Sequence, residues 1–207
     1  MSDVSCPWCA IGFKALEQAL GRVGDVATAD LHFQPFELNP DMGPEGQDLV
    51  EHVTEKYGAT QEQQAQTRET IRQRGEAVGF VFDTARRGRI YNTFDAHRLL
   101  TWAEGQGKQR ELKEALFTAY FTHCEDPSSH DVLVRVAGEV GLGREEAARI
   151  LASNEFADEV REREQFFQRA GIHSVPAIII NQRHLISGGQ PPDVFERALR
   201  ELASQQQ

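Results

Sequence analysis

The residues best suited to chemistry are two cysteines near the start of the chain, in the sequence Cys6-Pro7-Trp8-Cys9. Cysteines with this spacing at the start of a helix lie close enough to form a small disulfide ring. The pKa of a thiol falls near the unpaired N–H groups and the positive dipole end of a helix, where Cys6 is expected. Pro7 suits the first helical turn, in which a backbone N–H has no intrahelical partner. We predict a redox dithiol in which Cys6 attacks and Cys9 resolves the mixed disulfide.

A zinc site is the main alternative, because two cysteines with this spacing also form half of a zinc knuckle. The other half is missing, since the third cysteine, Cys124, has no cysteine or histidine pair at ligand spacing around it. The sequence therefore favours redox chemistry and predicts no metal site. For Cys124, a small buried hydrophobe is the leading interpretation, and a regulatory thiol that exchanges with the main pair is the alternative.

The length and composition of the chain narrow the class of protein. Its 207 residues suffice for one sizeable domain, or for a small domain with a large insertion. Three cysteines are too few for a disulfide-stapled secreted scaffold, and no apolar run resembles a signal peptide or a membrane span. We therefore expect a cytoplasmic protein without a membrane partner. The net charge of -10 and the lack of a basic patch with aromatic residues argue against a nucleic-acid partner.

Hydrophobic periodicity predicts an α/β chain interrupted by helices. A helix is expected from about residue 8 to residue 21 or 24, and then a strand in which Leu31 and Phe33 alternate with polar residues. Residues 41–170 are predicted to be helical, with Asn92 as an N-cap and a break near residues 153–154. The chain then returns to a strand at 177–180, buried on both faces, a hairpin turn, a strand at 184–187 and a terminal helix.

One basic segment stands out in the predicted helical region. Arg86-Arg87-Gly88-Arg89 follows a short apolar run that contains Phe80 and Phe82. A run of this kind is usually a solvated turn, and the alternative is an anion contact near the active face.

The predicted order of elements is that of a thioredoxin fold with a helical insertion. The chain resembles the DsbA-like thioredoxin-fold oxidoreductases, and within them the FrnE-like group. The matching stretches are SDVSCPWCAIG, QPFELNPDM, YNTFDAHRLLTWAEGQGK, AYFT and GIHSVPAIIINQRHLISGGQPP. Accordingly, we expect an α/β protein with a thioredoxin-like domain formed by residues 1–40 and 171–207 and an inserted helical domain at residues 41–170.

The resemblance implies roles for several residues besides the cysteines. Pro176 is expected to be cis and to face the cysteine pair, with the backbone of Val175 free to pair with a substrate. Pro7 and Trp8 complete the active-site loop, and Trp8 is expected to form an apolar rim for substrate contact. Asn92 and His97 are expected to contact the substrate or glutathione, although a surface histidine without such a role is an equal interpretation of His97. No cofactor is required, and glutathione is a candidate thiol co-substrate.

The dipeptide between the cysteines bears on the direction of the reaction. Strongly oxidising DsbA proteins have a histidine there, whereas this chain has Pro7-Trp8. Without an imidazole, the thiolate of Cys6 should be less stabilised and the disulfide less oxidising. Reduction, isomerisation and thiol transfer are therefore as consistent with the sequence as oxidation, on protein or small-molecule thiols, by a monomer or a homodimer.

The start of the chain departs from the pattern of the fold. A thioredoxin fold places an inner strand of the sheet directly before the cysteine motif. Only residues 1–5 precede Cys6, and at about 3.3 Å per residue they are too short for a strand of about five to six residues and a turn. We expect about eight further residues upstream of Met1, or else a short form that is unstable or borrows a strand from a neighbour.

Two other functions compete with thiol–disulfide exchange. Glutathione-dependent kappa-type transferases and 2-hydroxychromene-2-carboxylate isomerases have a related fold but activate a bound thiol. Serine often replaces the resolving cysteine in these enzymes, so the intact pair argues against them. A chaperone-like protein would instead bind substrates in an apolar groove near Trp8 and Pro176. Activity on insulin disulfides or on a glutathione-linked substrate separates the first two, and binding by a variant without both thiols would identify the third.

Overall fold

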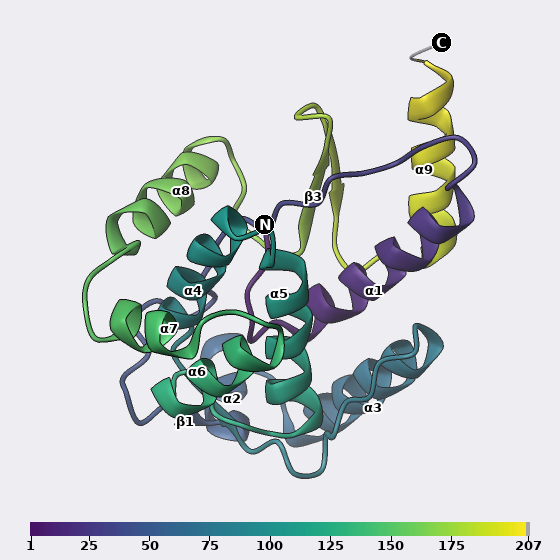
Figure 1. Cartoon of the computed structure of the whole chain (residues 1–207). Coiled ribbons are helices and arrows are strands. Elements are labelled where there is room, and N and C mark those ends of the chain that lie inside the picture. Colours follow the sequence, from purple (N-terminus) through teal and green to yellow (C-terminus); the bar gives the residue numbers. More distant parts are fainter. Residues whose placement is uncertain (206–207) are drawn as a thin grey trace.

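Helix α1 (Pro7–Arg22) starts directly after Cys6 in the computed structural model, which describes residues 1–205. Its apolar face buries Ile11, Phe13, Leu16 and Ala19, in agreement with the predicted helix. This face packs mainly against α9 (Pro192–Ser204), the predicted terminal helix, which lies alongside α1 (Figure 1). The first and last helices of the chain thus support each other, and the cysteine motif sits where α1 begins.

The strands β3 (Ala177–Ile180) and β4 (His184–Ser187) form the predicted antiparallel hairpin, with Ala177 opposite Ser187. The turn has positive φ angles of 53° at Asn181 and 57° at Gln182, as in a type I′ turn. The prediction that this strand is buried on both faces is wrong, because the side chain of Ile179 is 38% exposed. Among the described residues, β3 pairs along its length only with β4, so its other edge stays open.

A cavity of about 730 Å³ lies beside this open edge. Its lining includes residues 30–34, the strand β3, and Phe13 and Leu16 of α1. Met1 reaches the edge of β3, where its amino group donates to the Ala177 carbonyl at 2.8 Å and its carbonyl accepts from the Ala177 N–H at 3.2 Å. The expectation of a further strand before Met1 stays a prediction.

The predicted strand around Leu31 and Phe33 is not formed. Its segment makes one parallel bridge, between Ser2 and Pro35, instead of a ladder. The carboxamide of Gln109 takes the place of a neighbouring strand, because it accepts from the Phe33 N–H at 2.8 Å and donates to the Phe33 carbonyl at 2.9 Å. The backbone of this segment is therefore satisfied by a side chain.

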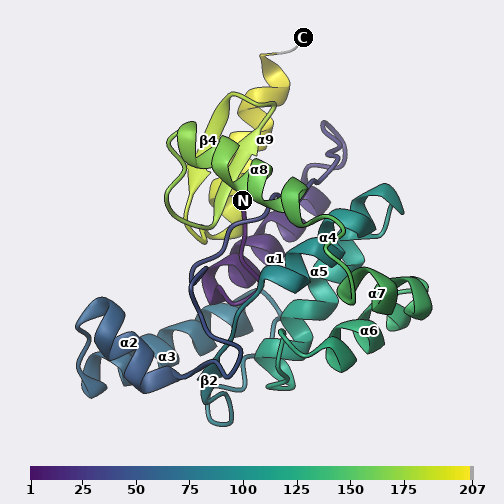
Figure 2. The same cartoon turned by 90° about the vertical axis from the view of Figure 1, so that its left-hand side faces the viewer.

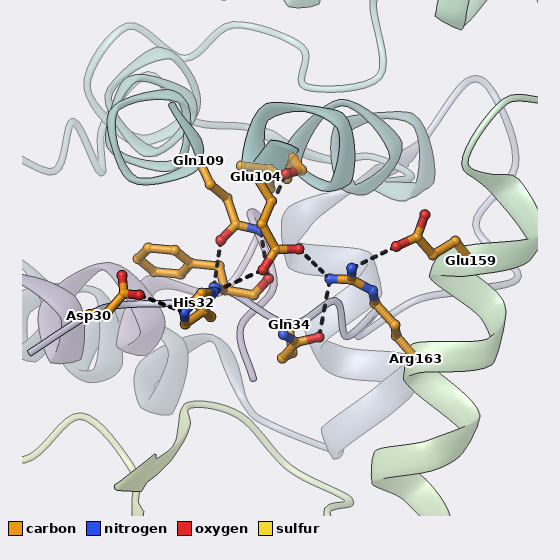
Figure 3. Close-up of polar contacts among 9 residues, drawn as sticks. Asp30, His32, Gln34, Glu104, Gln109, Glu159 and Arg163 are labelled. Atoms are coloured by element: carbon orange, nitrogen blue, oxygen red, sulfur yellow. Dashed lines mark hydrogen bonds and ion pairs between the residues drawn. The ribbon is translucent and has the colours of Figure 1, made fainter. Parts of the chain in front are cut away.

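A polar network ties the same segment to three helices: α4 (Phe94–Gly105), α5 (Gln109–Phe117) and α8 (Ala157–Arg169) (Figure 3). Glu104 of α4 is its centre, 2.9 Å from His32 Nδ1 and 2.6 Å from Arg163 Nη1. Arg163 also pairs with Glu159 at 2.6 Å. These contacts fix residues 30–34 against the helical part of the chain.

The remaining elements lie between Asn39 and Gly171, in the region predicted to be helical. They are β1 (Gln47–Asp48), α2 (Leu49–Tyr57), α3 (Gln61–Ala77), β2 (Arg89–Ile90), the π-helical turn η1 (Thr118–Thr122), α6 (His130–Glu139) and α7 (Arg144–Leu151). Figure 2 shows α2 and α3 on one side of the molecule and α6 and α7 on the other. The predicted break near residues 153–154 separates α7 from α8. No helix in residues 1–205 is both long and apolar enough to cross a membrane.

Two hydrophobic clusters form the core. The first contains the buried face of α1 and also Ile71 of α3, Phe82 and Phe121, so it crosses the predicted boundary at residue 40. The second lies among α4, α5, α6 and α7 and includes Val4. The two-domain division stays a prediction, while the packing joins α1 directly to the inserted helices.

A glycine in α3 allows residues of the first cluster to pack closely against this helix. A Cβ on Gly75 would lie 2.7 Å from the Phe80 carbonyl oxygen and would overlap the Phe82 ring. We expect Gly75→Ala to lower the free energy of unfolding by about 1–3 kcal/mol, the usual cost of overpacking. Gly21→Ala in α1 is the matched control, because a Cβ there would meet nothing within 4 Å, and it should raise stability by about 0.5–1 kcal/mol. Urea unfolding measures both, and equal effects of the two substitutions would contradict the packing described here.

Candidate active site

Cys6 occupies the N-cap position of α1, with φ −91° and ψ 111°. Its carbonyl accepts from the N–H groups of Cys9 at 3.1 Å and Ala10 at 3.3 Å, which start the helix. Pro7 is the first helical residue, as predicted. Both thiols are free and nearly closed to solvent, with exposures of 3% for Cys6 and 2% for Cys9.

A buried carboxylate holds the segment that leads into the cysteine motif. Asp3 accepts from the N–H groups of Ser5 at 3.1 Å and Leu38 at 2.6 Å, and its carbonyl accepts from the Cys6 N–H at 3.3 Å. His97 Nε2 lies 3.6 Å from its Oδ1. Burial alone would raise the pKa of Asp3, but His97 and the two N–H groups hold it at about 2. Asp3 is therefore ionised and fixes the backbone beneath Cys6.

The returning part of the chain meets the cysteine motif at the peptide bond between Val175 and Pro176, which is cis, as the resemblance implies. The Cys6 thiol donates to the Val175 carbonyl, with an Sγ–O distance of 3.9 Å. Glycine at residue 189 permits this approach, because a Cβ there would lie 2.8 Å from the Trp8 carbonyl oxygen. Cys6 and Val175, 169 residues apart in sequence, thus face each other.

The pKa values of the two thiols are shifted in opposite directions. Burial raises the pKa of Cys9, but the interaction with the Cys6 sulfur and the charge of Lys113 outweigh it, so the pKa of Cys9 is lowered. The pKa of Cys6 is raised, first by its interaction with the Cys9 sulfur and then by burial. Because the two thiols interact, they titrate as a pair, and the assignment of Cys6 as the attacking sulfur stays a prediction.

Lys113 supplies the positive charge on the inner side of the pair. Its side chain is fully buried in α5, with Nζ 3.4 Å from the Ser2 carbonyl and 5.0 Å from the centre of the Phe117 ring. No carboxylate among the described residues lies within ion-pair distance of it. Burial lowers its pKa from 10.5 to about 8, although the thiols and Asp3 oppose that effect. The nearest negative groups are thus Cys9, Asp3 and Cys6.

Cys6 opens onto a pocket of about 350 Å³. Its walls come from the start of α1, from residues 38 and 39, and from the α2 and α3 helices. Pro7, Trp8 and Val175 also line this pocket, and their role as the active-site loop stays a prediction. Cys9 lines the separate cavity next to β3. Only Cys6 is therefore presented to a molecule bound in this pocket.

The structure does not place the two expected substrate contacts at the pocket. His97 is 2% exposed and packs against Asp3 on the inner side of the motif. The Asn92 side chain accepts from the Phe94 N–H at 2.8 Å and donates to the Met42 carbonyl at 3.3 Å, so it is occupied by backbone groups. The N-cap of α4 is Thr93 rather than Asn92.

Sequence reasoning missed Asp3 and Lys113. The signal for Lys113 was a charged residue inside the apolar stripe of Leu112, Leu116 and Phe117, a position where charge is unusual unless it has a purpose. Asp3 left a weaker signal, since an acid in a short segment before a motif is ordinarily solvated. Neither could be paired with Cys9 without the fold.

The remaining candidates stay apart from the pair. Cys124 is half-buried rather than buried, has a φ of 60°, and its thiol donates to the Asp83 carbonyl at 3.7 Å. Within residues 1–205, no group of three or more His, Cys, Asp or Glu side chains has the arrangement of a metal site.

Comparisons with known proteins bear on the family and the fold of the chain. A family model described as the DSBA-like thioredoxin domain matches residues 1–200. The probable DsbA oxidoreductase SCO1869 from Streptomyces coelicolor is 31% identical, with a TM-score of 0.89 over 100% of this chain and 88% of that chain. The protein YwbO from Bacillus subtilis (strain 168) is 27% identical over 96% of this chain and 92% of that protein. The cytosolic disulfide reductase DsbM from Pseudomonas aeruginosa with GSH is 16% identical, with a TM-score of 0.67 over 98% and 96% of the two chains. The predicted fold class is confirmed.

The charge of Lys113 can be tested through the thiols. We expect Lys113→Met to raise the pKa of Cys9, because the thiolate loses its nearest cation while the buried site keeps a side chain of similar size. The ultraviolet absorbance of the thiolate, followed against pH in the reduced protein, should therefore rise at higher pH than in the unmodified chain.

Lys108→Met is the matched control for that titration. Lys108 lies just before α5, and its side chain is 41% exposed and paired with Glu111. It should leave the thiolate titration unchanged. An unchanged titration in Lys113→Met would show that Lys113 does not lower the pKa of Cys9.

The same substitution should change stability with pH. Because the pKa of Lys113 is 10.5 when unfolded and about 8 when folded, the unfolded chain binds more protons between these values, and stability rises with pH across that window. Below pH 8 the buried charge costs about 3 kcal/mol. We expect Lys113→Met to be more stable by about this amount at neutral pH, with an advantage that shrinks above pH 8. Denaturant unfolding at several pH values measures it, and a constant difference would contradict the assignment.

Proposed function

Because the chain belongs to the family of DSBA-like thioredoxin domains, we propose that it is a thiol–disulfide oxidoreductase that acts through Cys6 and Cys9. One observation carries the proposal. Cys6 lies at the N-cap of α1, hydrogen-bonded to the Val175 carbonyl, and opens onto a pocket, while Cys9 lies behind it. The outer sulfur is thus placed to meet a disulfide and the inner sulfur to release it.

The first step is attack by the Cys6 sulfur on one sulfur of a substrate disulfide. Cys6 attacks as the thiolate, after its proton has passed to solvent or to the neighbouring Cys9 sulfur, and its sulfur forms the new S–S bond. The S–S bond of the substrate breaks, and one substrate thiolate leaves. The backbone of Val175 gives an extended substrate backbone a place to pair next to Cys6.

The second step resolves the mixed disulfide. The Cys9 sulfur attacks Cys6, its proton goes to the departing sulfur, and the second substrate thiol is released. The substrate disulfide is reduced by two electrons and the cysteine pair is oxidised to a disulfide. The reverse sequence oxidises a dithiol, so the same residues serve oxidation, reduction or isomerisation.

The protein substrates and small thiols predicted from the sequence remain part of the proposal, with glutathione as a candidate co-substrate and no cofactor needed. A relative of the same fold is a cytosolic disulfide reductase studied with GSH. We propose the cytoplasm as the compartment, since a reducing environment suits a transient catalytic disulfide. Membership of the FrnE-like group also stays a prediction.

The division of labour between the cysteines is testable by trapping. We expect a Cys9→Ser variant to accumulate a mixed disulfide at Cys6, because the resolving sulfur is gone, and a Cys6→Ser variant to form none. Mass spectrometry of the intact protein after incubation with an oxidised thiol measures the adduct, and both variants should lose turnover in an insulin reduction assay.

Cys124→Ser is the matched control, since it removes a thiol outside the pair and should retain turnover. If Cys9→Ser captures no thiol and the unmodified pair does not cycle, the oxidoreductase proposal fails. Persistent binding of unfolded proteins by a variant without both thiols would then favour the chaperone-like alternative.

A further inference from the structure

The pocket at Cys6 differs in charge from the rest of the molecule. The chain has 32 acidic and 22 basic residues, yet no carboxylate lines this pocket. Two arginines do: Arg68 from α3 and Arg87 from the loop before β2. The basic segment around Arg87 was noted in the sequence as a solvated turn or an anion contact, and the structure brings it to the wall of the pocket.

Both arginines are half-buried and have no partner for their charge. Most other arginines of the chain pair with a carboxylate, for example Arg72 with Glu69 at 2.8 Å on the same helix as Arg68. No ion pair or side-chain hydrogen bond of Arg68 or Arg87 exists within residues 1–205. The Arg87 guanidinium lies instead over the rings of Tyr120, at 5.3 Å, and Phe121, at 5.1 Å. Stacking of this kind fixes the plane of the guanidinium and leaves its N–H groups free.

The shape of the pocket limits what can reach the sulfur. Cys6 is only 3% exposed, so a substrate must enter between α1 and the α2 and α3 helices. A volume of about 350 Å³ lies in the range of small-molecule sites and suits a molecule of roughly dipeptide or tripeptide size. A disulfide on the surface of a folded protein would be held away by these helices.

We propose that Arg68 and Arg87 bind the carboxylates of a low-molecular-weight disulfide whose sulfur is placed at Cys6. The proposal rests on the proposed function and names its substrate class. An anionic disulfide RSSR meets the reduced pair, Cys6 forms the mixed disulfide with one RS group, and Cys9 resolves it, so that RSSR becomes two RSH and the pair becomes a disulfide. A guanidinium binds a carboxylate through two parallel N–H donors, which also orients the molecule.

Three small disulfides of similar length provide the test: dithiodipropionate, which carries two carboxylates, bis(hydroxyethyl) disulfide, which is neutral, and cystamine, which carries two ammonium groups. Each is mixed with the reduced protein, and the rate of oxidation of the cysteine pair is divided by the rate for free dithiothreitol. We expect the normalised rate to be highest for dithiodipropionate, about tenfold or more above the neutral disulfide, and lowest for cystamine. Added salt should reduce this preference.

Substitutions assign the preference to the two arginines. Arg68→Gln and Arg87→Gln should each reduce the normalised rate for dithiodipropionate by about fivefold to tenfold and leave that for the neutral disulfide unchanged. Arg72→Gln, on the outer face of α3, is the matched control and should change neither. Arg87→Lys keeps the charge but loses the planar donors, so its normalised rate for dithiodipropionate should lie between those of the unmodified protein and Arg87→Gln. A thermal melt of each variant separates loss of binding from loss of folding.

The outcomes distinguish the two proposals. Oxidation of the pair by none of the three disulfides would sink the proposed function itself. Equal normalised rates, or an anionic preference that survives in the Arg68→Gln, Arg87→Gln double variant, would overturn the arginine site while leaving thiol–disulfide exchange intact. Reduction of insulin that is faster than that of every small disulfide and unaffected by the arginine substitutions would also overturn it, in favour of protein substrates.

Discussion

The active site depends on the close approach of two backbones that are distant in sequence. A Cβ on Gly12 would lie 3.3 Å from Gly189 Cα, and one on Gly189 would lie 2.8 Å from the Trp8 carbonyl oxygen. The first turn of α1 can therefore lie directly against Pro176 and the segment after β4. This contact places Cys6 opposite the Val175 carbonyl, and α9, which follows the same segment, packs along the rest of α1. The N-cap geometry of Cys6 would be of little use without it, because the sulfur would lack the facing backbone that a substrate needs.

Buried charges of opposite sign contribute to the opposite pKa shifts of the two thiols. The charge of Asp3 contributes to the raised pKa of Cys6, after the hydrogen bond to Cys9 and burial, whereas Lys113 contributes to the lowered pKa of Cys9. The positive end of α1 acts on both thiols, so it cannot separate them by itself. The lowered pKa of Cys9 depends in part on Lys113, a lysine that is buried without an ion-pair partner among the described residues, and burial of this charge destabilises the fold.

Much of the fold was predictable from the sequence, and the failures have identifiable physical causes. The helix after Cys6, the break between α7 and α8 and the β3–β4 hairpin follow from local periodicity and turn chemistry. The strand around Leu31 was mispredicted because a strand needs a hydrogen-bonded neighbour, and Gln109, far along the chain, supplies the bonds instead. His97 was misplaced because helical periodicity predicts which side chains share a face of the helix, but not which group of the folded protein lies against that face. For His97 this group is Asp3.

The charge of the pocket at Cys6 could not be predicted from the composition of the chain. A net charge of -10 indicates an acidic surface, and from it one expects anions to be repelled. The field at a site, however, is set by groups within roughly a Debye length, about 8 Å at physiological ionic strength, and by the low dielectric of its walls. Arg68 and Arg87 are 19 residues apart in sequence and reach the pocket from α3 and from the loop before β2. No carboxylate lines this pocket, so these two arginines give the pocket that contains Cys6 a positive charge. The acidic residues elsewhere on the chain then increase the preference of an anionic ligand for this pocket, because such a ligand is attracted only where the two arginines lie.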